Sequence, residues 1–298
     1  MGVRQVANVF YGDILKKQAE LQERRTLKVY IQTDIEGVAG FCFYENRKSR
    51  DQEAINHRYR MYKLLTDEVN SAVKAAFDSG ATEVIVNDNH GTGYNILFEE
   101  LDPRCRIIHG RNCSGPHWLP LLDSSFDAML LIGMHAMGGT QCSITPHSLW
   151  DVNDGEIYLS EGSMAAAIAG DLGVPVVMVS GDDKITAEIE EKIPGIEVAQ
   201  VKQAISPYQA CSMVPKAACE LIYQKVKAAL GKTGTVKPYK LAGPLRLVLW
   251  DSPGHLPPLD KVGETVEAQT ITEAFFKFEN AMPWTNFDLK DPDGFVFP

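Results

Sequence analysis

The segment LKVYIQTDIEGVAG, residues 27–40, decides the fold that the rest of the chain can adopt. Its first seven residues are rich in β-branched and aromatic side chains, which is typical of a buried strand. Asp34 and Glu36 follow, and because side chains alternate along an extended chain, both carboxylates point to the same side. A cation between them would remove their mutual repulsion. The segment therefore predicts a buried strand that ends at a cation site, with a solvated acidic turn as the alternative.

Three more apolar segments of strand length follow along the chain, at residues 83–86, 126–133 and 174–180. Apolar residues recur at helical spacing between them, so we expect helices at residues 51–79 and 160–172. An alternation of buried strands with helices predicts an α/β fold, with a mainly parallel sheet flanked by helices.

The pattern changes after residue 194, where the expected strands and helices belong to a second, smaller α+β lobe at the C-terminus. These elements are strands at residues 198–201 and 245–250 and helices at residues 215–230 and 270–279. We therefore divide the chain into three parts. They are an N-terminal extension (1–26), a metal-binding α/β catalytic domain (27–194) and a smaller α+β domain (195–298). Within the extension, residues 13–25 predict an amphipathic helix, either a frayed arm or a subunit contact.

Composition and charge exclude several classes of protein. The 298 residues are 45% hydrophobic and 23% charged, which is typical of a globular protein with a sizeable core. The net charge of −10 argues against nucleic acid or an anionic membrane as a partner, because both require a basic face. No apolar run approaches the roughly 18 residues of a membrane span. Without a secretory signal or a C-x-x-C pair, we expect a cytoplasmic protein with free thiols.

Other candidate ligands follow the later strands. Asp88 and His90 come directly after the second strand, and His135 comes after the third. Glu161 lies in the first turn of the alanine-rich helix at residues 160–172. Because the carboxyl ends of parallel strands meet at one edge of a sheet, we expect these side chains to converge near Asp34. The alternatives are a turn cap for His90 and ordinary helix-dipole compensation for Glu161.

Five side chains make up the expected ligand set: Asp34, Glu36, His90, His135 and Glu161. Mixed imidazole and carboxylate ligands suit zinc or a similar transition metal better than magnesium or calcium. Five ligands exceed the needs of one tetrahedral zinc with an open position, but they fit two metals about 3.5–4 Å apart with one bridging carboxylate. Asp34, nearest its strand end, is the natural bridge. The residues therefore predict a site for two metal ions in each subunit, of zinc or a similar transition metal.

His147 is not at a strand end, because it lies in a Thr-Pro-His-Ser loop that follows Gly138 and Gly139. A histidine in such a loop could act as a general acid or base, or polarise a carbonyl. An ordinary loop histidine is the alternative interpretation.

Five segments in this order resemble the zinc D-aminopeptidases of the dipeptide-transport-associated type, peptidase family M55. The segments are TDIEGVAG, VNDNHG, GMHA, SEGSMAAAIAG and VPVVMVSGDD, and the resemblance runs from about residue 28 to at least residue 206. Any one segment would be weak, but five in the right order are specific to the family.

The resemblance implies a dinuclear zinc site with Asp34 bridging both metals. Glu36 and His135 would complete one site, and His90 and Glu161 the other. His147 matches the family's proposed catalytic histidine. The resemblance also implies hydrolysis of short peptides with an N-terminal D-residue, such as D-Ala-D-Ala, and assembly into a homodecameric ring.

Two other functions remain open at this point. One is a magnesium-dependent phosphohydrolase of the haloacid-dehalogenase type, suggested by D-I-E-G after one strand and G-D-D after a later one. That reading leaves His90 and His135 without a role and needs an aspartate where Glu36 stands. The other is a non-catalytic peptide- or metal-binding protein linked to transport, in which His147 would be incidental.

Overall fold

The computed structural model describes residues 26–44, 49, 51–110, 118–252 and 256–281. The helix expected at residues 13–25 therefore lies outside the described residues. Each strand and helix that the sequence predicts within the described ranges is present. The structure also contains a short 3₁₀ turn, η1 (Phe98–Glu100).

A seven-stranded sheet forms the larger part of the molecule, in the order β3-β2-β1-β4-β7-β8-β9. Its members are β1 (Leu27–Thr33), β2 (Ala81–Asp88), β3 (Arg106–Ile108), β4 (Ala128–Met134), β7 (Val176–Asp182), β8 (Glu197–Ser206) and β9 (Gln209–Ser212). All neighbours pair in parallel except β9, which runs antiparallel to β8. The mainly parallel α/β fold is confirmed.

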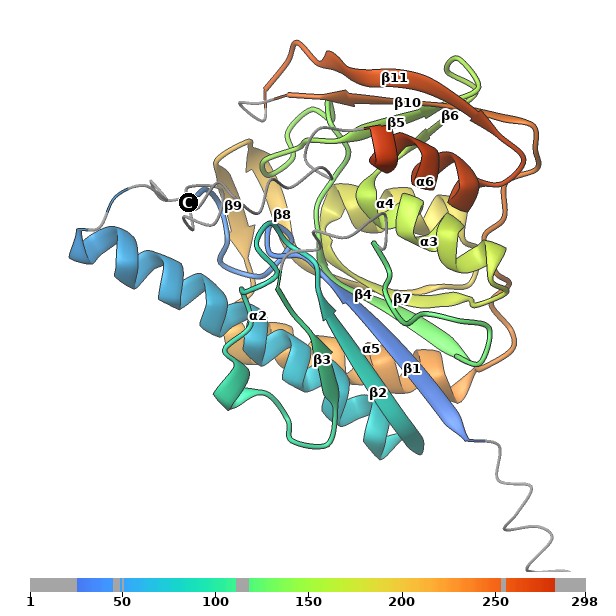
Figure 1. Cartoon of the computed structure of the whole chain (residues 1–298). Coiled ribbons are helices and arrows are strands. Elements are labelled where there is room, and N and C mark those ends of the chain that lie inside the picture. Colours follow the sequence, from blue (N-terminus) through green and yellow to red (C-terminus); the bar gives the residue numbers. More distant parts are fainter. Residues whose placement is uncertain (1–25, 45–48, 50, 111–117, 253–255, 282–298) are drawn as a thin grey trace, which may run out of the picture.

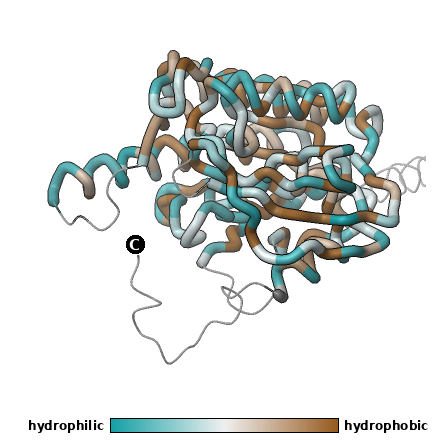
Figure 2. Tube along the Cα trace, turned by 90° about the horizontal axis from the view of Figure 1, so that it is seen from above, coloured by the Kyte–Doolittle hydropathy of each residue, from teal (hydrophilic) through white to brown (hydrophobic). Residues whose placement is uncertain are grey.

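Helices cover both faces of this sheet (Figure 1). Helices α2 (Gln52–Asp78) and α5 (Pro215–Gly231) pack together on one face, and α3 (Glu161–Asp171) and α4 (Asp183–Lys192) lie on the other. Strands β4 and β7 are buried along their whole length, as expected for a parallel sheet covered on both faces. Figure 2 shows the hydrophobic segments running through the middle of the molecule, with hydrophilic segments mostly at its periphery.

A second, smaller sheet of four antiparallel strands has the order β11-β10-β5-β6. It consists of β5 (Leu149–Val152), β6 (Ile157–Leu159), β10 (Leu245–Asp251) and β11 (Asp260–Ala268), and α6 (Ile271–Ala281) packs against it. Trp150 of β5 contacts Phe275 and Phe278 of α6 with ring centroids 5.4 and 5.0 Å apart. These contacts join the small sheet to its helix.

The two sheets do not divide the chain at residue 194. Strands β8 and β9, which follow that residue, extend the large sheet, whereas β5 and β6, which precede it, pair with β10. The proposed boundary between two domains at this position stays a prediction. Among the described helices, none is both long enough and apolar enough to cross a membrane.

Gly133 of β4 lies against the turn that follows β1. Its φ of +75° is in the left-handed region, and a Cβ there would lie 2.2 Å from the carbonyl oxygen of Asp34. The amides of Asp34 and Gly37 donate to the carbonyls of Ile132 and Gly133 at 2.9 and 2.8 Å. The absence of a side chain at Gly133 therefore allows this turn to sit on the end of β4.

We expect Gly133→Ala to lower the free energy of unfolding by about 1–3 kcal/mol more than Gly173→Ala, the usual cost of overpacking. Gly173 also has a positive φ, +81°, but a Cβ there meets no atom within 4 Å. Both variants therefore share the left-handed penalty of about 1–2 kcal/mol, and only Gly133→Ala adds a clash. Urea unfolding measures both values, and equal losses would contradict this interpretation.

Candidate metal centre

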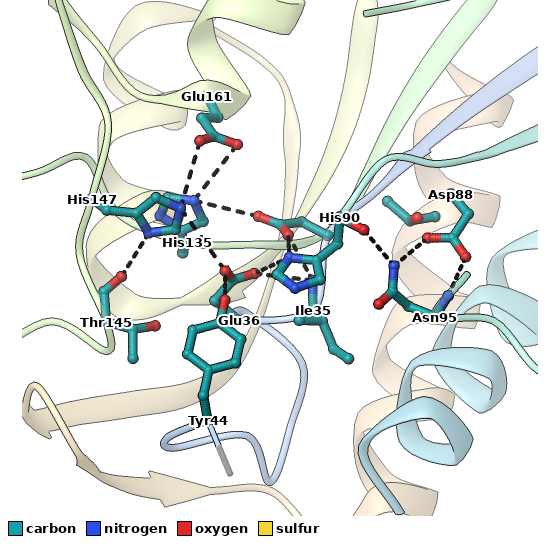
Figure 3. A network of polar contacts seen from close by, with 12 residues as sticks. Ile35, Glu36, Tyr44, Asp88, His90, Asn95, His135, Thr145, His147 and Glu161 are labelled. Atoms are coloured by element: carbon teal, nitrogen blue, oxygen red, sulfur yellow. Dashed lines mark hydrogen bonds and ion pairs between the residues drawn. The ribbon is translucent and has the colours of Figure 1, made fainter. Parts of the chain in front are cut away.

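Asp34 and Glu36 lie in the turn that directly follows the carboxyl end of β1. Figure 3 shows the carboxylate of Glu36 between the side chains of Tyr44 and His90. The side chains of Asp34 and Glu36 are both buried, and the amide of Ile35 donates to Asp34 Oδ1 at 2.8 Å. Two buried carboxylates this close repel each other, and burial adds a desolvation cost to each charge. The turn therefore needs positive charge beside it.

His90 supplies one positive partner. Its Nδ1 lies 3.0 Å from Asp34 Oδ1 and 3.1 Å from Glu36 Oε2. The loop that carries His90 is held by Asp88, whose Oδ2 accepts from the amides of Asn95 and Ile96 at 2.6 and 2.9 Å. Asp88 therefore builds the loop, and His90 faces the turn. Asp34, Glu36 and His90 together form what we call the first ligand group, because their ligand atoms lie within 4.8 Å of one another.

A second ligand group consists of Asp34, His135 and Glu161. His135 Nε2 lies 3.4 Å from Asp34 Oδ2 and 3.8 Å from Glu161 Oε2. The other ring nitrogen of His135, Nδ1, lies 2.8 Å from the carbonyl oxygen of Ala136. A carbonyl can only accept, so Nδ1 carries a proton and Nε2 is the nitrogen available to a cation.

Each predicted ligand therefore lies in the cluster. Glu36 and His135, which the resemblance implied as partners, share a third ligand group with His147, and each also belongs to one of the two groups above. His90 and Glu161, the other implied partners, share no ligand group within the described part of the chain. The physical reason is topological. Glu161 begins α3, which is on the β4 side of Asp34, whereas His90 follows β2 on the opposite side of β1.

The cluster fits a zinc ion on its own chemistry. Asp34 Oδ2 and His135 Nε2 are buried, and neither makes a hydrogen bond to another described residue. Buried polar atoms without partners are costly, and a cation between these two would satisfy both. Their separation of 3.4 Å matches the edge of a tetrahedron with zinc–ligand bonds of roughly 2.1 Å. Imidazole and carboxylate ligands together are also those that zinc accepts.

In the absence of a cation, protons balance the charge of the cluster. Burial raises the pKa of Asp34 to about 7, with Glu36 adding repulsion. Burial alone would lower the pKa of His90, but the adjacent carboxylates, Glu36 foremost, raise it to about 10. Burial likewise opposes the charge of Glu161, yet His135 holds the pKa of this carboxyl at about 2. The histidines therefore hold protons that a metal ion would displace.

His147 reaches the same cluster from its loop. Its Nε2 lies 3.6 Å from Glu161 Oε1 and 3.9 Å from Glu36 Oε1, and its ring stacks on His135 with centroids 4.0 Å apart. Its Nδ1 lies 3.0 Å from the carbonyl oxygen of Thr145. The side chain is 17% exposed, whereas that of His135 is fully buried. His147 therefore lies on the open side of the cluster, next to one carboxylate from each ligand group.

Tyr44 is a site residue that the sequence analysis missed. Its hydroxyl donates to Glu36 Oε1, and its ring stacks on that of His90 with centroids 5.8 Å apart. No pattern in the loop at residues 41–49 singled it out, because a tyrosine beside charged residues is common on protein surfaces.

Comparisons with known proteins agree on one family. The model of the peptidase M55 family, described as D-aminopeptidase, matches residues 27–252. A D-aminopeptidase of Bacillus subtilis (strain 168) is 34% identical over 233 residues, which cover 75% of this chain and 80% of that one. The solved structure of the "Zn-dependent D-aminopeptidase DppA from Bacillus subtilis, a self-compartmentalizing protease" superposes with a TM-score of 0.72. It is 29% identical, and the match covers 84% of this chain and 94% of that chain.

We expect zinc to release protons when it binds to the metal-free protein at pH 7.5, because the adjacent carboxylates raise the pKa of His90 to about 10 and hold the pKa of His135 well above its usual value. Zinc affinity should accordingly weaken as the pH falls. Calorimetric titration in buffers of different ionisation enthalpy measures the released protons. A heat of binding that is the same in every buffer would contradict this expectation.

Proposed function

Because the chain belongs to the peptidase M55 family of D-aminopeptidases, we propose that it hydrolyses short peptides with an N-terminal D-amino acid. Peptides of the D-Ala-D-Ala type are the expected substrates, and two zinc ions in each subunit are the expected cofactors. Asp34, Glu36, His90, His135 and Glu161 would hold the metals, and His147 would act in catalysis.

The orientation of Asp34 is the observation that best supports two metals. Its Oδ1 faces His90 in the first ligand group, and its Oδ2 faces His135 in the second. One carboxylate thus offers a separate oxygen to each group, as a bridging ligand does. Glu36 and Glu161 supply one further carboxylate to each side.

The bound zinc would polarise the scissile carbonyl and lower the pKa of the attacking water towards 7. The remaining proton transfers fall to His147. Its Nδ1 proton is committed to the carbonyl of Thr145, so in the neutral ring Nε2 is an acceptor facing the cluster. His147 would accept a proton at Nε2 when water attacks and return it to the leaving amine.

Assembly belongs to the same proposal. DppA from Bacillus subtilis, whose structure is similar to that of this chain, is described as a self-compartmentalizing protease. We infer that this chain also forms a closed homo-oligomer, with the decameric ring as the expected form, and that the enclosed space admits only short peptides. A cytoplasmic location stays a prediction from the sequence.

Asp34→Ala is expected to lose both zinc ions and all hydrolysis of D-Ala-D-Ala, because it removes the ligand that the two groups share. Glu161→Gln touches only the second group and should keep the zinc of the first. Elemental analysis after dialysis measures the zinc, and release of free D-alanine measures hydrolysis.

Asp123→Asn, in a turn where Asp123 caps the amide of Ser125, is the matched control and should match the wild type. L-Ala-L-Ala should be a poor substrate in the same assay. Hydrolysis by a zinc-free Asp34→Ala protein would contradict the proposal, and so would a wild-type preference for the L-dipeptide.

His147→Gln should keep the zinc content of the wild type while kcat falls by about 10²–10⁴-fold, the usual contribution of a general acid–base group. The reason is that the five ligands remain and only the proton carrier is lost. Steady-state kinetics and elemental analysis on the same sample separate the two effects. Loss of zinc in this variant would show that His147 is a ligand instead.

A further inference from the structure

Lys202 of β8 is a buried charged side chain with no role in the mechanism above. Lys202 is only 2% exposed. Removing an ammonium group from water costs free energy unless the group is fully hydrogen-bonded. Its Nζ donates to the carbonyl oxygens of Glu36, Val38 and Phe41, the last two at 3.1 and 2.9 Å. An ammonium has three donors, so these three carbonyls use all of them.

The three carbonyls belong to one turn, residues 34–41, which follows β1. This turn has left the sheet, so its buried carbonyls have no neighbouring strand to pair with. A second buried side chain assists: Glu68 of α2 accepts from the amide of Ala39 at 2.8 Å. Lys202 of β8 and Glu68 of α2 therefore make the hydrogen bonds to the backbone of this turn that a neighbouring strand would otherwise make.

Glu36 links this support to the metal centre. Lys202 holds the backbone carbonyl of Glu36, while the side chain of Glu36 lies in the first ligand group. Asp34, two residues earlier, is the ligand that both groups share. A shift of the turn would therefore move two of the five ligands together, and ligands need to be held within about 0.5 Å of their working positions.

We propose that Lys202 is a positioning residue for the metal centre, which it serves by tethering the turn that carries Asp34 and Glu36. This inference rests on the proposed zinc site. It predicts that the loss of the tether changes the metal's coordination even in a protein that remains folded.

The test compares Lys202→Met with the wild type. Methionine keeps the length and apolar stem of the side chain and removes the three donors. Zinc affinity, measured by competition with a chromophoric chelator, should fall by about 10–100-fold, the usual loss when an outer-shell partner is removed. The visible spectrum of the Co²⁺-loaded protein should also change, since it reports the coordination geometry directly.

Lys225→Met is the matched control, because Lys225 of α5 pairs at 3.0 Å with Glu197, the first residue of β8, and the variant should leave both measurements unchanged. Lys202→Met could leave Glu68 without a counter-charge and prevent folding. The double variant Lys202→Met/Glu68→Gln avoids this and still lacks the tether. Glu68→Gln alone keeps both the tether and an acceptor for Ala39, so the double variant should bind zinc about 10–100-fold more weakly than Glu68→Gln.

Wild-type zinc affinity and an unchanged Co²⁺ spectrum in a folded Lys202→Met protein would overturn the role of Lys202 and leave the proposed function intact. Equal zinc affinity in Glu68→Gln and the double variant would do the same. A wild-type protein that binds no zinc would overturn the proposed function as well. A wild-type protein that binds zinc but does not cleave D-peptides would overturn the proposed substrate and leave the tether intact.

Discussion

The structure depends on the charge of one buried carboxylate. Asp34 lies at the end of a central strand, where water cannot compensate its charge, and each of its oxygens faces a different histidine. The free-energy cost of removing an ionised carboxylate from water is offset only if positive charge is held close to it. The two ligand groups are arranged around that requirement, which the proposed zinc ions would satisfy.

The parallel sheet brings the compensating groups together. Strands β2, β1 and β4 are neighbours and run in the same direction, so the segments that follow them emerge at one edge. His90 and His135 thereby reach Asp34 from its two sides, although 45 positions separate them in the sequence. The helix α3 adds Glu161 from its first turn, where the helix dipole also favours a carboxylate. The match to the family model runs over residues 27–252, which include every element that carries a candidate ligand.

Several features of the fold and site could be predicted from local sequence. The alternation of side chains placed Asp34 and Glu36 together, and the strand ends brought His90 and His135 into the ligand set. Local sequence placed His90 and not Asp88 in the ligand set, but it assigned no role to Asp88. In the structure Asp88 accepts backbone amides of its own loop, and only His90 faces the turn. The role of Asp88 depends on where residues 95 and 96 lie, which no short-range pattern specifies.

The sequence by itself determined the α/β class, the strands that end at the site and the candidate ligands, because these depend on periodicity and on residue chemistry. Only the tertiary structure decided which ligands lie next to one another and which strands form the small sheet. It also showed that Tyr44 and Lys202 hydrogen-bond to Glu36. Such contacts join residues that are far apart in the chain. A lysine in an apolar strand such as β8 has no visible partner until folding places the carbonyls of residues 36–41 around it.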